Sequence, residues 1–421
     1  MSHSQMSSPI YWPQDDIENL EGYRPGGYHP TNINDKFLNG RYKVVHKLGY
    51  GSYSTVWLAR DQEAGRYVAL KIIVAEVSGK AVESKILRRL QSGNPNHPGR
   101  QYIASLLNEF FFTGPNGHHR CLVSEVHGCS VAESKENSTD FKFSPDISRA
   151  IAAQVTLGLA YMHSQGVGHG DLHARNILLR LDDIDCMSTQ EIYERFGKPF
   201  KVSIRRMDKA PIGQEAPTHA IIPMDTIVPS NRVKDCRVKI TDFGTSFLTS
   251  DCKAPTTLHT PTTLLPPEAF FNDPINVSAD IWTLGCTLYD ILGERPLFET
   301  WAGDPDDVLG EMVSTLGPFP ARWWQKWENR PVFFLDDGRW NPKFNRIQTP
   351  EFRSLDQRMW TMGRGKTSET CEFEEAEMDS LRSLLAAMLA YEPSERVTAE
   401  GALESEYMRR WGRPALARCL S

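Results

Sequence analysis

The sequence predicts an α+β protein in which strands come first and helices follow. Alternation of apolar and polar residues runs through Arg41–His46, Tyr53–Ala59 and Tyr67–Val74, and glycine-bearing turns separate these segments. Helical spacing of apolar residues then dominates from Ser144 onward and is clear in Asp379–Ala390. These patterns give the class α+β.

Composition excludes several classes of protein. The chain has 421 residues, of which 40% are apolar and 24% charged, which is typical of a globular protein. No apolar run reaches the length of about 18 residues that a membrane helix needs, and Met1–Pro13 lacks the basic start and apolar core of a signal peptide. The 8 cysteines form no CxxC pair, so we expect reduced thiols in a cytoplasmic and/or nuclear protein. A net charge of −6 argues against direct binding of nucleic acid.

The first strands carry a glycine-rich turn. Residues 1 to 40 form an N-terminal extension, and we expect it to be mobile except for Gly22–Phe37, which is pinned to the domain. After it, Gly49 and Gly51 lie between two strands. Glycine lets backbone N–H groups approach phosphate oxygens, although a tight hairpin turn would use the same residues.

A lysine inside the next apolar strand is the second candidate. Lys71 lies in Tyr67–Val74, and a buried lysine is costly unless a carboxylate pairs with it. Apolar residues at helical spacing then predict a helix over Lys80–Gln91, and Glu83 on that helix is the expected partner. The alternative is a lysine at the sheet edge with its amine in water.

The loop His169–Asn176 follows a helix that Ser144 and Pro145 are expected to begin and that ends near Ser164. Asp171 is a carboxylate at a fixed point of this loop, and Asn176 is a neutral oxygen ligand five positions on. This spacing is that of a kinase catalytic loop. A polar loop without function could also carry these residues.

The second half supplies further pieces. Asp182–Cys236 is polar, predicts one short helix over Thr189–Phe196, and looks like an insertion between two strands of one domain. Val238–Ile240 is a predicted strand that leads to Asp242-Phe243-Gly244, where an acid could hold a metal. Glu268 is expected to pair with Arg396 inside the helical part.

Together these motifs resemble the eukaryotic protein kinases, over roughly residues 41 to 411. The resemblance implies a bilobal fold: a β-rich N-lobe at 41–126, a larger helical C-lobe at 127–411 with the insertion at about 182–236, and a tail at 412–421. Tyr53-Ser54-Thr55-Val56-Trp57, with a serine in place of the third glycine, is similar to the SR-protein-specific kinases (SRPK). Gly197-Lys198-Pro199 and Pro217-Thr218-His219 look like the form of this group found in filamentous fungi.

The resemblance also implies a role for each matching residue. ATP and Mg²⁺ would be the cofactors, Asp171 would orient the attacking hydroxyl, Lys71 would hold phosphates, and Asn176 and Asp242 would bind magnesium. The substrate would be a protein, with Arg/Ser-rich splicing factors as candidates, and we expect a monomer. The residues expected to bind the nucleotide are Leu48, Gly49, Gly51, Ser54, Val56, Ala69, Lys71, Glu83, Glu125, His127 and Leu178.

Some positions depart from the family pattern. Gly170 stands where many kinases have an arginine that receives a phosphorylated activation loop, so activity independent of such phosphorylation is expected. His173 replaces the usual lysine, and Arg175, our third catalytic candidate, could take over its contact with phosphate. An acidic cluster at Asp304–Glu311 predicts an acid-capped helix start, or by analogy with the family a docking site for basic substrate segments.

Two other functions remain open. A pseudokinase that binds nucleotide without transferring phosphate would fit the loss of the usual arginine and lysine near Asp171. A small-molecule phosphotransferase would fit His-Gly-Asp-Leu-His followed by an asparagine, which resembles aminoglycoside and choline kinases. The set Glu268, Asp280 and Arg396 belongs to protein kinases and argues against the second alternative.

Overall fold

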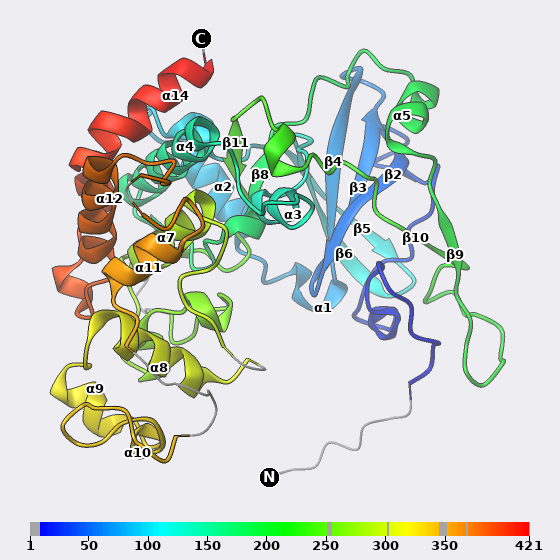
Figure 1. Ribbon diagram of the computed structural model, residues 1–421. Coiled ribbons are helices and arrows are strands. Elements are labelled where there is room, and N and C mark those ends of the chain that lie inside the picture. The colour runs from blue at the N-terminus through cyan, green and yellow to red at the C-terminus, as the bar shows by residue number, and fades with distance from the viewer. Residues whose placement is uncertain (1–8, 251–254, 301–302, 345–351, 368, 421) are drawn as a thin grey trace. The chain divides into compact units, whose positions relative to one another are not determined.

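The computed structural model describes residues 9–250, 255–300, 303–344, 352–367 and 369–420 (Figure 1). Its contacts divide the chain into two compact units. Unit 1 comprises Met1–Arg88, Ala104–Gly128 and Leu181–Thr226, and unit 2 comprises Arg89–Ile103, Cys129–Arg180 and Ile227–Ser421. Residues 1–8 of the predicted extension and 251–254 lie outside the described residues. No helix of the described residues combines the length and the apolar character needed to cross a membrane.

Unit 1 is built on one antiparallel sheet of six strands in the order β1-β2-β3-β4-β6-β5. Glycine-bearing and Asn-Gly turns join neighbouring strands, as expected for hairpins. The strand bounds are β1 (Lys36–Phe37), β2 (Tyr42–Gly51), β3 (Ser54–Asp61), β4 (Arg66–Ile73), β5 (Leu106–Gly114) and β6 (Gly117–Ser124). Two helices, α1 (Ala75–Ser78) and α2 (Glu83–Gln91), follow β4. The predicted helix over Lys80–Gln91 therefore begins three residues later, at Glu83.

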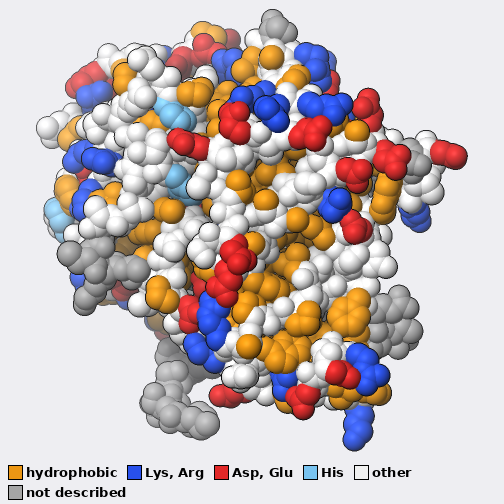
Figure 2. All heavy atoms as spheres, turned by 90° about the vertical axis from the view of Figure 1, so that its left-hand side faces the viewer, with side chains coloured by type: hydrophobic (Ala, Val, Ile, Leu, Met, Phe, Trp, Pro, Cys, Tyr) orange, Lys and Arg blue, Asp and Glu red, His pale blue; other side chains and the backbone are white. Residues whose placement is uncertain are grey.

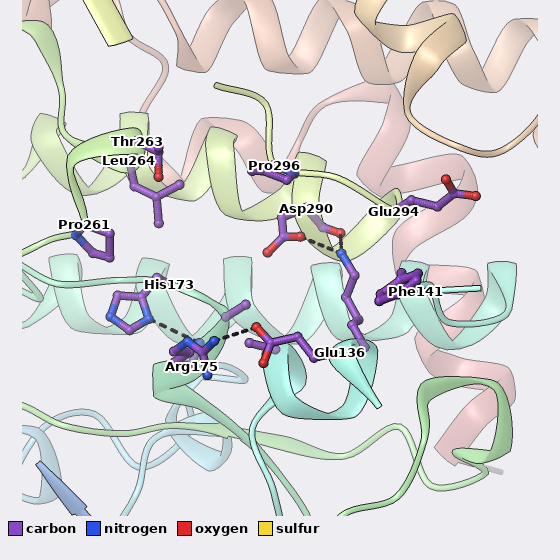
Figure 3. Close-up of a pocket in the computed structure, with 13 residues that line it drawn as sticks. Glu136, Phe141, His173, Arg175, Pro261, Thr263, Leu264, Asp290, Glu294 and Pro296 are labelled. Carbon is purple, nitrogen blue, oxygen red and sulfur yellow. Dashed lines mark hydrogen bonds and ion pairs between the residues drawn. The ribbon is translucent and has the colours of Figure 1, made fainter. Parts of the chain in front are cut away.

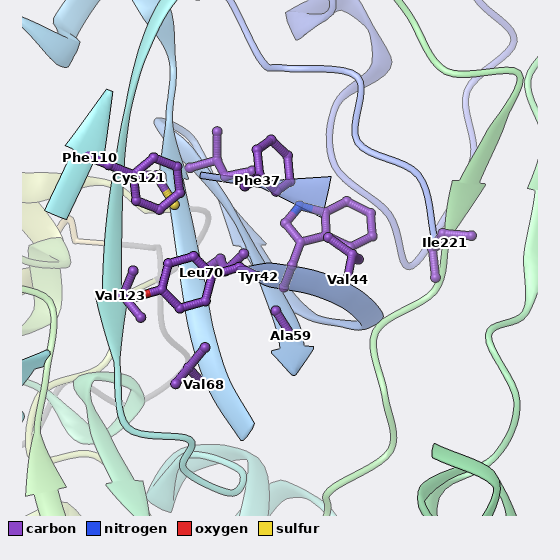
Figure 4. Packing of buried hydrophobic residues seen from close by; sticks show 12 residues of the cluster. Phe37, Tyr42, Val44, Ala59, Val68, Leu70, Phe110, Cys121, Val123 and Ile221 are labelled. Carbon is purple, nitrogen blue, oxygen red and sulfur yellow. The ribbon is translucent and has the colours of Figure 1, made fainter. Parts of the chain in front are cut away.

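Alternating side chains of the strands form the core of unit 1 (Figure 4). Trp57, Val68 and Leu70 are fully or almost fully buried there, because successive strand residues point to opposite faces and these share one face. Burial of large apolar side chains contributes about 1.5–3 kcal/mol each. The core thus holds β2, β3 and β4 rigidly enough to position the residues at their ends.

The insertion up to Thr226 belongs to unit 1 with the six-stranded sheet, which differs from its predicted assignment to the larger lobe, while residues 227–236 belong to unit 2 as predicted. Its helix α5 (Thr189–Phe196) places the fully buried Ile192 against Val45 and Leu58. Its strands β9 (Lys201–Ser203) and β10 (His219–Ile221) pair with each other. The strands on either side of the insertion, β8 (Ile177–Leu179) and β11 (Val238–Ile240), pair in unit 2, as predicted for an insertion between two strands of one domain.

The N-terminal extension also belongs to the core of unit 1. Tyr11, Ile17 and Leu20 are buried together with Ile204 and Ala220 of the insertion. The packed part thus begins well before Gly22, where the sequence analysis placed it. The reason is that the insertion supplies the apolar partners, and its fold could not be foreseen from local pattern.

Unit 2 is mainly helical and is organised around α4 (Pro145–Ser164), most of whose residues are buried. The predicted tail is not separate: α14 (Arg413–Leu420) packs on α4 through Ala415 and Leu416.

Acidic and basic side chains are interspersed on the face shown in Figure 2. The other helices are α3 (Val131–Glu136), α6 (Pro267–Phe270), α7 (Ser278–Leu292), α8 (Pro305–Leu316), α9 (Ala321–Lys326), α10 (Arg330–Phe333), α11 (Leu355–Thr361), α12 (Glu375–Met388) and α13 (Ala399–Leu403), and two short strands, β7 (Val167–Gly168) and β12 (Phe247–Leu248), pair.

Candidate active site

In unit 1 the glycine-rich turn joins β2 and β3. Gly49 pairs with Val56 and Gly51 with Ser54, so the turn is a continuation of the ladder. A Cβ placed on Gly49 or Gly51 would meet no atom within 4 Å, so packing inside the protein does not require these glycines. Open space beside a glycine backbone is what a phosphate group approaching N–H donors needs.

The N-terminal extension contacts this turn, which the sequence analysis missed. The hydroxyl of Tyr28 donates a hydrogen bond of 2.8 Å to the carbonyl oxygen of Gly51. Behind it, the buried Lys47 of β2 forms an ion pair with the buried Glu18, and Tyr23 donates to the same carboxylate. The signal that could have predicted this is Lys47 itself, a cation in an otherwise apolar strand face that needs a partner.

The pairing of Lys71 with Glu83 is present as predicted. The Nζ of Lys71 lies 2.7 Å from Oε2 and 2.9 Å from Oε1 of Glu83. Lys71 is opposite Val56 on the neighbouring strand, and Ala69 lies two residues before it on the same face. The charged Lys71, held by Glu83, thus lies on one face of the sheet with Val56 and Ala69, two small apolar residues that were predicted to contact the nucleotide. Glu125 and His127 follow the end of β6 in the same unit.

In unit 2 the predicted loop brings Asp171 and Asn176 together. The amide nitrogen of Asn176 donates to the backbone oxygen of Asp171 at 2.9 Å and to its Oδ2 at 3.2 Å. The other carboxylate oxygen, Oδ1, lies 3.3 Å from Nε2 of His173 and has no hydrogen bond of good geometry among the described residues. An acceptor oxygen held ready in this way suits a group that takes a hydrogen bond from a substrate hydroxyl.

Asp280 of α7 fixes the start of this loop. Its carboxylate accepts hydrogen bonds from the backbone N–H of His169 at 2.7 Å and of Gly170 at 2.9 Å, and from His163 at 3.0 Å. Burial would raise the pKa of Asp280, but the hydrogen bond and charge of His163 outweigh it and hold the pKa below its usual value. A buried anion with three donors is a stable anchor, so the loop has little freedom.

The structure explains why a glycine occupies position 170, where many kinases have an arginine. Its φ is +77°, and a Cβ there would lie 2.8 Å from the carbonyl oxygen of Thr245. The carbonyl oxygen of Gly170 accepts a hydrogen bond of 3.1 Å from Thr260, and that of His169 one of 2.9 Å from Ser246. Direct hydrogen bonds from the segment after Asp242 therefore hold the loop.

Asp242 and Asn176 lie at the ends of paired strands. The N–H of Thr241 donates to the carbonyl oxygen of Asn176 at 2.9 Å. This hydrogen bond keeps the backbone before Asp242 next to the backbone of Asn176. Asp242 has a φ of +59°, and such conformations of non-glycine residues cluster at functional sites. Phe243 is buried, and its ring centroid lies 5.5 Å from that of His169. Burial holds the pKa of His169 below its usual value, although the charges of Asp280 and Asp171 act in the opposite direction.

These oxygens fit a small hard cation. One carboxylate and one amide oxygen are ligands that Mg²⁺ accepts, because it usually keeps waters and substrate phosphates as its other ligands. No group of three or more His, Cys, Asp or Glu side chains among the described residues could hold a metal by itself. A site of this kind would thus bind Mg²⁺ together with the phosphates. Leu178, the remaining predicted nucleotide contact, lies in β8 beside Asn176.

The other charged residues of the prediction have partners elsewhere. Arg175 forms an ion pair of 2.5 Å with Glu136, and among the described residues it has no side-chain contact with Asp171. The acidic cluster is an acid-capped helix start, as predicted: Asp304 caps α8. Within it, Asp306 accepts from Trp327 and Asn329, both at 2.6 Å, and Glu311 pairs with two arginines. The carboxylates of Asp306 and Glu311 are thus engaged inside unit 2.

Comparison with known proteins agrees with this arrangement. A family model described as protein kinase domain matches residues 42–187 and 226–408, and the gap between them falls within the insertion. The "Serine/threonine-protein kinase SRPK" of Physarum polycephalum is 29% identical over 414 residues, which are 93% of this chain and 91% of that relative. "SRSF protein kinase 3" of Homo sapiens is 39% identical over 170 residues, which are 39% of this chain and 30% of that protein. A crystal structure of the kinase domain of PF14_0431 superposes with a TM-score of 0.62 at 20% identity and covers 90% of this chain and 98% of that chain.

Proposed function

The chain belongs to the protein kinase family, and from that premise we propose that it transfers the γ-phosphoryl group of ATP to serine or threonine in Arg/Ser-rich proteins. It is a serine/threonine-protein kinase of the SRPK group, and this family uses ATP and Mg²⁺. The observation that carries the proposal is the loop on which Asp171 and Asn176 are hydrogen-bonded to each other and held by Asp280.

In the proposed mechanism Asp171 orients the hydroxyl of the substrate and accepts its proton. Oδ1 is the proposed acceptor, because it makes no hydrogen bond of good geometry among the described residues, whereas Oδ2 accepts from Asn176. Asn176 donates through its amide nitrogen, so its amide oxygen would remain available to hold Mg²⁺, and the carboxylate of Asp242 would be the second protein ligand. The metal, when bound, neutralises charge on the phosphates.

Lys71 binds the phosphates of the nucleotide, and Glu83 holds the lysine in position. Support comes from the direct ion pair of 2.7 Å between the two side chains. The backbone of Gly49, Gly51 and Ser54 covers the phosphates, and Leu48, Val56, Ala69 and Leu178 contact the base, with Glu125 and His127 supplying polar contacts to its edge. Positioning and charge stabilisation then provide most of the catalysis.

His173 takes the place of the family's lysine in this proposal. Its Nε2 lies 3.3 Å from Oδ1 of Asp171, so it can orient that carboxylate or donate toward a bound phosphate. Arg175 is our weaker candidate for this task, since its guanidinium is engaged with Glu136. A comparison of His173→Lys, His173→Ala and Arg175→Ala in kcat would separate the two residues.

The test is phosphate transfer from labelled ATP–Mg²⁺ to an Arg-Ser repeat peptide. Asp171→Asn is expected to lower kcat by about 10²-fold or more while ATP still binds, because the variant keeps the shape but loses the proton acceptor. Asp182→Asn, an exposed carboxylate of the insertion, is the matched control and should leave kcat unchanged. ATP binding without any transfer by the wild-type chain would instead favour the pseudokinase.

We further infer a monomer in the cytoplasm or nucleus. For the compartment, support is that the described cysteines Cys121, Cys129, Cys186, Cys236, Cys286, Cys371 and Cys419 form no disulfide bonds. Sedimentation of the purified chain and fractionation of expressing cells test these two points. A dimer, or recovery of the chain in the secreted fraction, would contradict them.

A further inference from the structure

Two cysteines that are far apart in the chain lie next to each other in unit 2. Cys236 comes just before β11, and Cys419 lies in α14 near the end of the chain. The side chains of this cysteine pair are in hydrogen-bonding contact. Cys236 is fully buried, whereas Cys419 is partly exposed. Solvent therefore reaches one thiol of the pair and not the other.

Helix α4 brings the two cysteines together. The backbone oxygen of Asp146, in the first turn of α4, accepts from the Sγ of Cys419 at 3.9 Å. Gln154 donates through its Nε2 to the backbone oxygen of Cys236 at 2.7 Å and to that of Ala150 at 3.1 Å. Asp146, Ala150 and Gln154 are spaced by four residues and thus lie along one face of the helix. Both cysteines are therefore anchored on the same face of α4, independently of their contact with each other.

The helix that carries Cys419 is held on α4 by few contacts. Ala415 and Leu416 are its buried residues, and Arg418 forms an ion pair of 2.8 Å with Asp146. The two charged side chains are each about half exposed, so water and salt weaken their attraction. Terminal elements with little buried surface open more readily than the rest of a domain. A covalent bond at Cys419 would therefore change the behaviour of α14 most.

The surroundings of the cysteine pair make its two thiols unequal in reactivity. Burial, and after it the neighbouring Cys419, raise the pKa of the Cys236 thiol to about 12. The thiolate is the form that reacts with oxidants, so Cys236 is inert by itself near neutral pH. The partly exposed Cys419 is the position at which a small oxidant reaches the pair first.

The cysteine pair does not line the cavity beside the catalytic loop. This cavity has a volume of about 300 Å³, and Figure 3 shows His173, Arg175 and Leu264 among the residues around it. None of the described residues that line it is a cysteine. Chemistry at the pair can thus be measured separately from phosphate transfer, and an inference about it goes beyond the proposed function.

We propose that Cys236 and Cys419 form a reversible oxidation site, at which a peroxide converts the two thiols into a disulfide bond that fastens α14 to the chain before β11. In the first step the sulfur of Cys419 attacks one oxygen of hydrogen peroxide, the O–O bond breaks, and a sulfenic acid and one water form. In the second step the sulfur of Cys236 attacks the sulfenic sulfur, and the hydroxide that leaves takes the proton of Cys236 to form a second water. Two thiols are thereby oxidised, and one peroxide is reduced to two waters. A dithiol reverses the reaction by thiol–disulfide exchange.

The test treats the full folded chain with hydrogen peroxide, blocks the remaining thiols and digests the protein without reductant. Mass spectrometry should find a peptide in which Cys236 is linked to Cys419, and dithiothreitol should remove this link. Cys419→Ser should abolish it, and this variant is expected to fold because the side chain is partly exposed. Cys371→Ser is the matched control, since it removes another partly exposed cysteine of unit 2, and it should keep the link.

The stability of α14 is the second readout. The disulfide closes a loop of about 180 residues and restricts the unfolded chain, so the oxidised protein should have a Tm higher by about 5–10 °C. Hydrogen exchange of the amides in 413–420 should become slower by about tenfold or more. Peroxide should cause neither change in Cys419→Ser, and dithiothreitol should reverse both changes in the wild-type chain.

The proposal is overturned if peroxide produces no link to Cys236, or if Cys419 is instead linked to another cysteine or oxidised to sulfinic acid. A link that forms in equal yield after unfolding in urea would also overturn it, because the fold would then not select the pair. A link that leaves hydrogen exchange in 413–420 unchanged would contradict the fastening of α14.

Discussion

The hydroxyl of Tyr28 donates a hydrogen bond of 2.8 Å to the carbonyl oxygen of Gly51, at the turn expected to cover the phosphates of ATP. Tyr28 is anchored in turn, because Asn116 donates to its carbonyl oxygen and the ring lies edge-on to Tyr23 with the centroids 5.6 Å apart. A segment outside the matched family region thus restrains a loop inside it. Restraint before binding lowers the entropy that ATP must remove when it orders the loop.

Tyr28→Phe should raise the KM for ATP by about fivefold, because one hydrogen bond of about 1 kcal/mol is lost while the ring remains. Hydrogen exchange at Gly51 and its neighbours should become faster. Tyr53→Phe is the control, since Tyr53 lies on the same turn, is 58% exposed, and its hydroxyl has no hydrogen bond among the described residues. Equal KM values for the two variants would show that the contact has no functional weight.

Among the threonines of the loop after Asp242, Thr260 is expected to affect kcat when it is replaced. Thr260→Val keeps the shape but leaves the Gly170 carbonyl without its donor at 3.1 Å, and we expect kcat to fall about tenfold through a less ordered catalytic loop. Thr260→Ser should restore most of the rate. The exposed Thr257→Ala should leave it unchanged, in line with activity that needs no loop phosphorylation. A large loss in Thr257→Ala would contradict that expectation.

The buried ion pair of Glu268 and Arg396 predicts that substitutions at the two positions have non-additive effects on the free energy of unfolding. The guanidinium donates to the carboxylate at 2.7 and 2.6 Å, and both side chains are at most 1% exposed. Glu268→Gln or Arg396→Met should each lower the free energy of unfolding by about 3–5 kcal/mol, since each leaves a buried charge unpaired. The double variant should lose less than the sum, by about 2 kcal/mol in urea unfolding. Additive losses would mean that the pair does not interact.

The lowered pKa of His29 predicts how the free energy of unfolding depends on pH. Burial, with a smaller effect from His119, lowers the pKa of His29 to about 4. The unfolded chain takes up this proton near pH 6.5, so the free energy of unfolding is full above about pH 6.5 and falls as pH drops toward 4, by at most about 3 kcal/mol. His29→Phe should weaken that dependence in urea unfolding at about pH 7.5 and pH 5. A variant at the exposed His219, His219→Gln, should keep the wild-type slope, and an unchanged slope in His29→Phe would refute the assignment.

Local pattern predicted the elements whose signals are short in sequence. The strand Val238–Ile240 and the helix Thr189–Phe196 have the bounds that the sequence predicts, and the structure adds that Ser188 caps the helix with a capping box. The ion pair of Lys71 and Glu83 was predictable because a buried charge needs a partner and the next helix offered one. These cases needed only neighbouring residues.

Pattern failed where partners are far apart in the chain. Nothing near Lys47 supplies its counter-ion, and Glu18 reaches it only because the extension folds back onto β2. Likewise the insertion looked polar, and its apolar residues, among them Ile192 and Ile204, form a core only with partners from the strands and the extension of unit 1. Such long-range contacts depend on tertiary structure and not on local propensity.

The packing of the extension against the insertion makes these two segments depend on each other for burial of their apolar side chains. Residues before position 42 and between 188 and 225 lie outside the matched family region, yet Tyr11, Leu20, Ile204 and Ala220 share one core. Deleting either piece strips the other of its apolar cover and exposes it to water. The two additions therefore form one structural module, so a variant that lacks either piece is expected to expose apolar surface of the other.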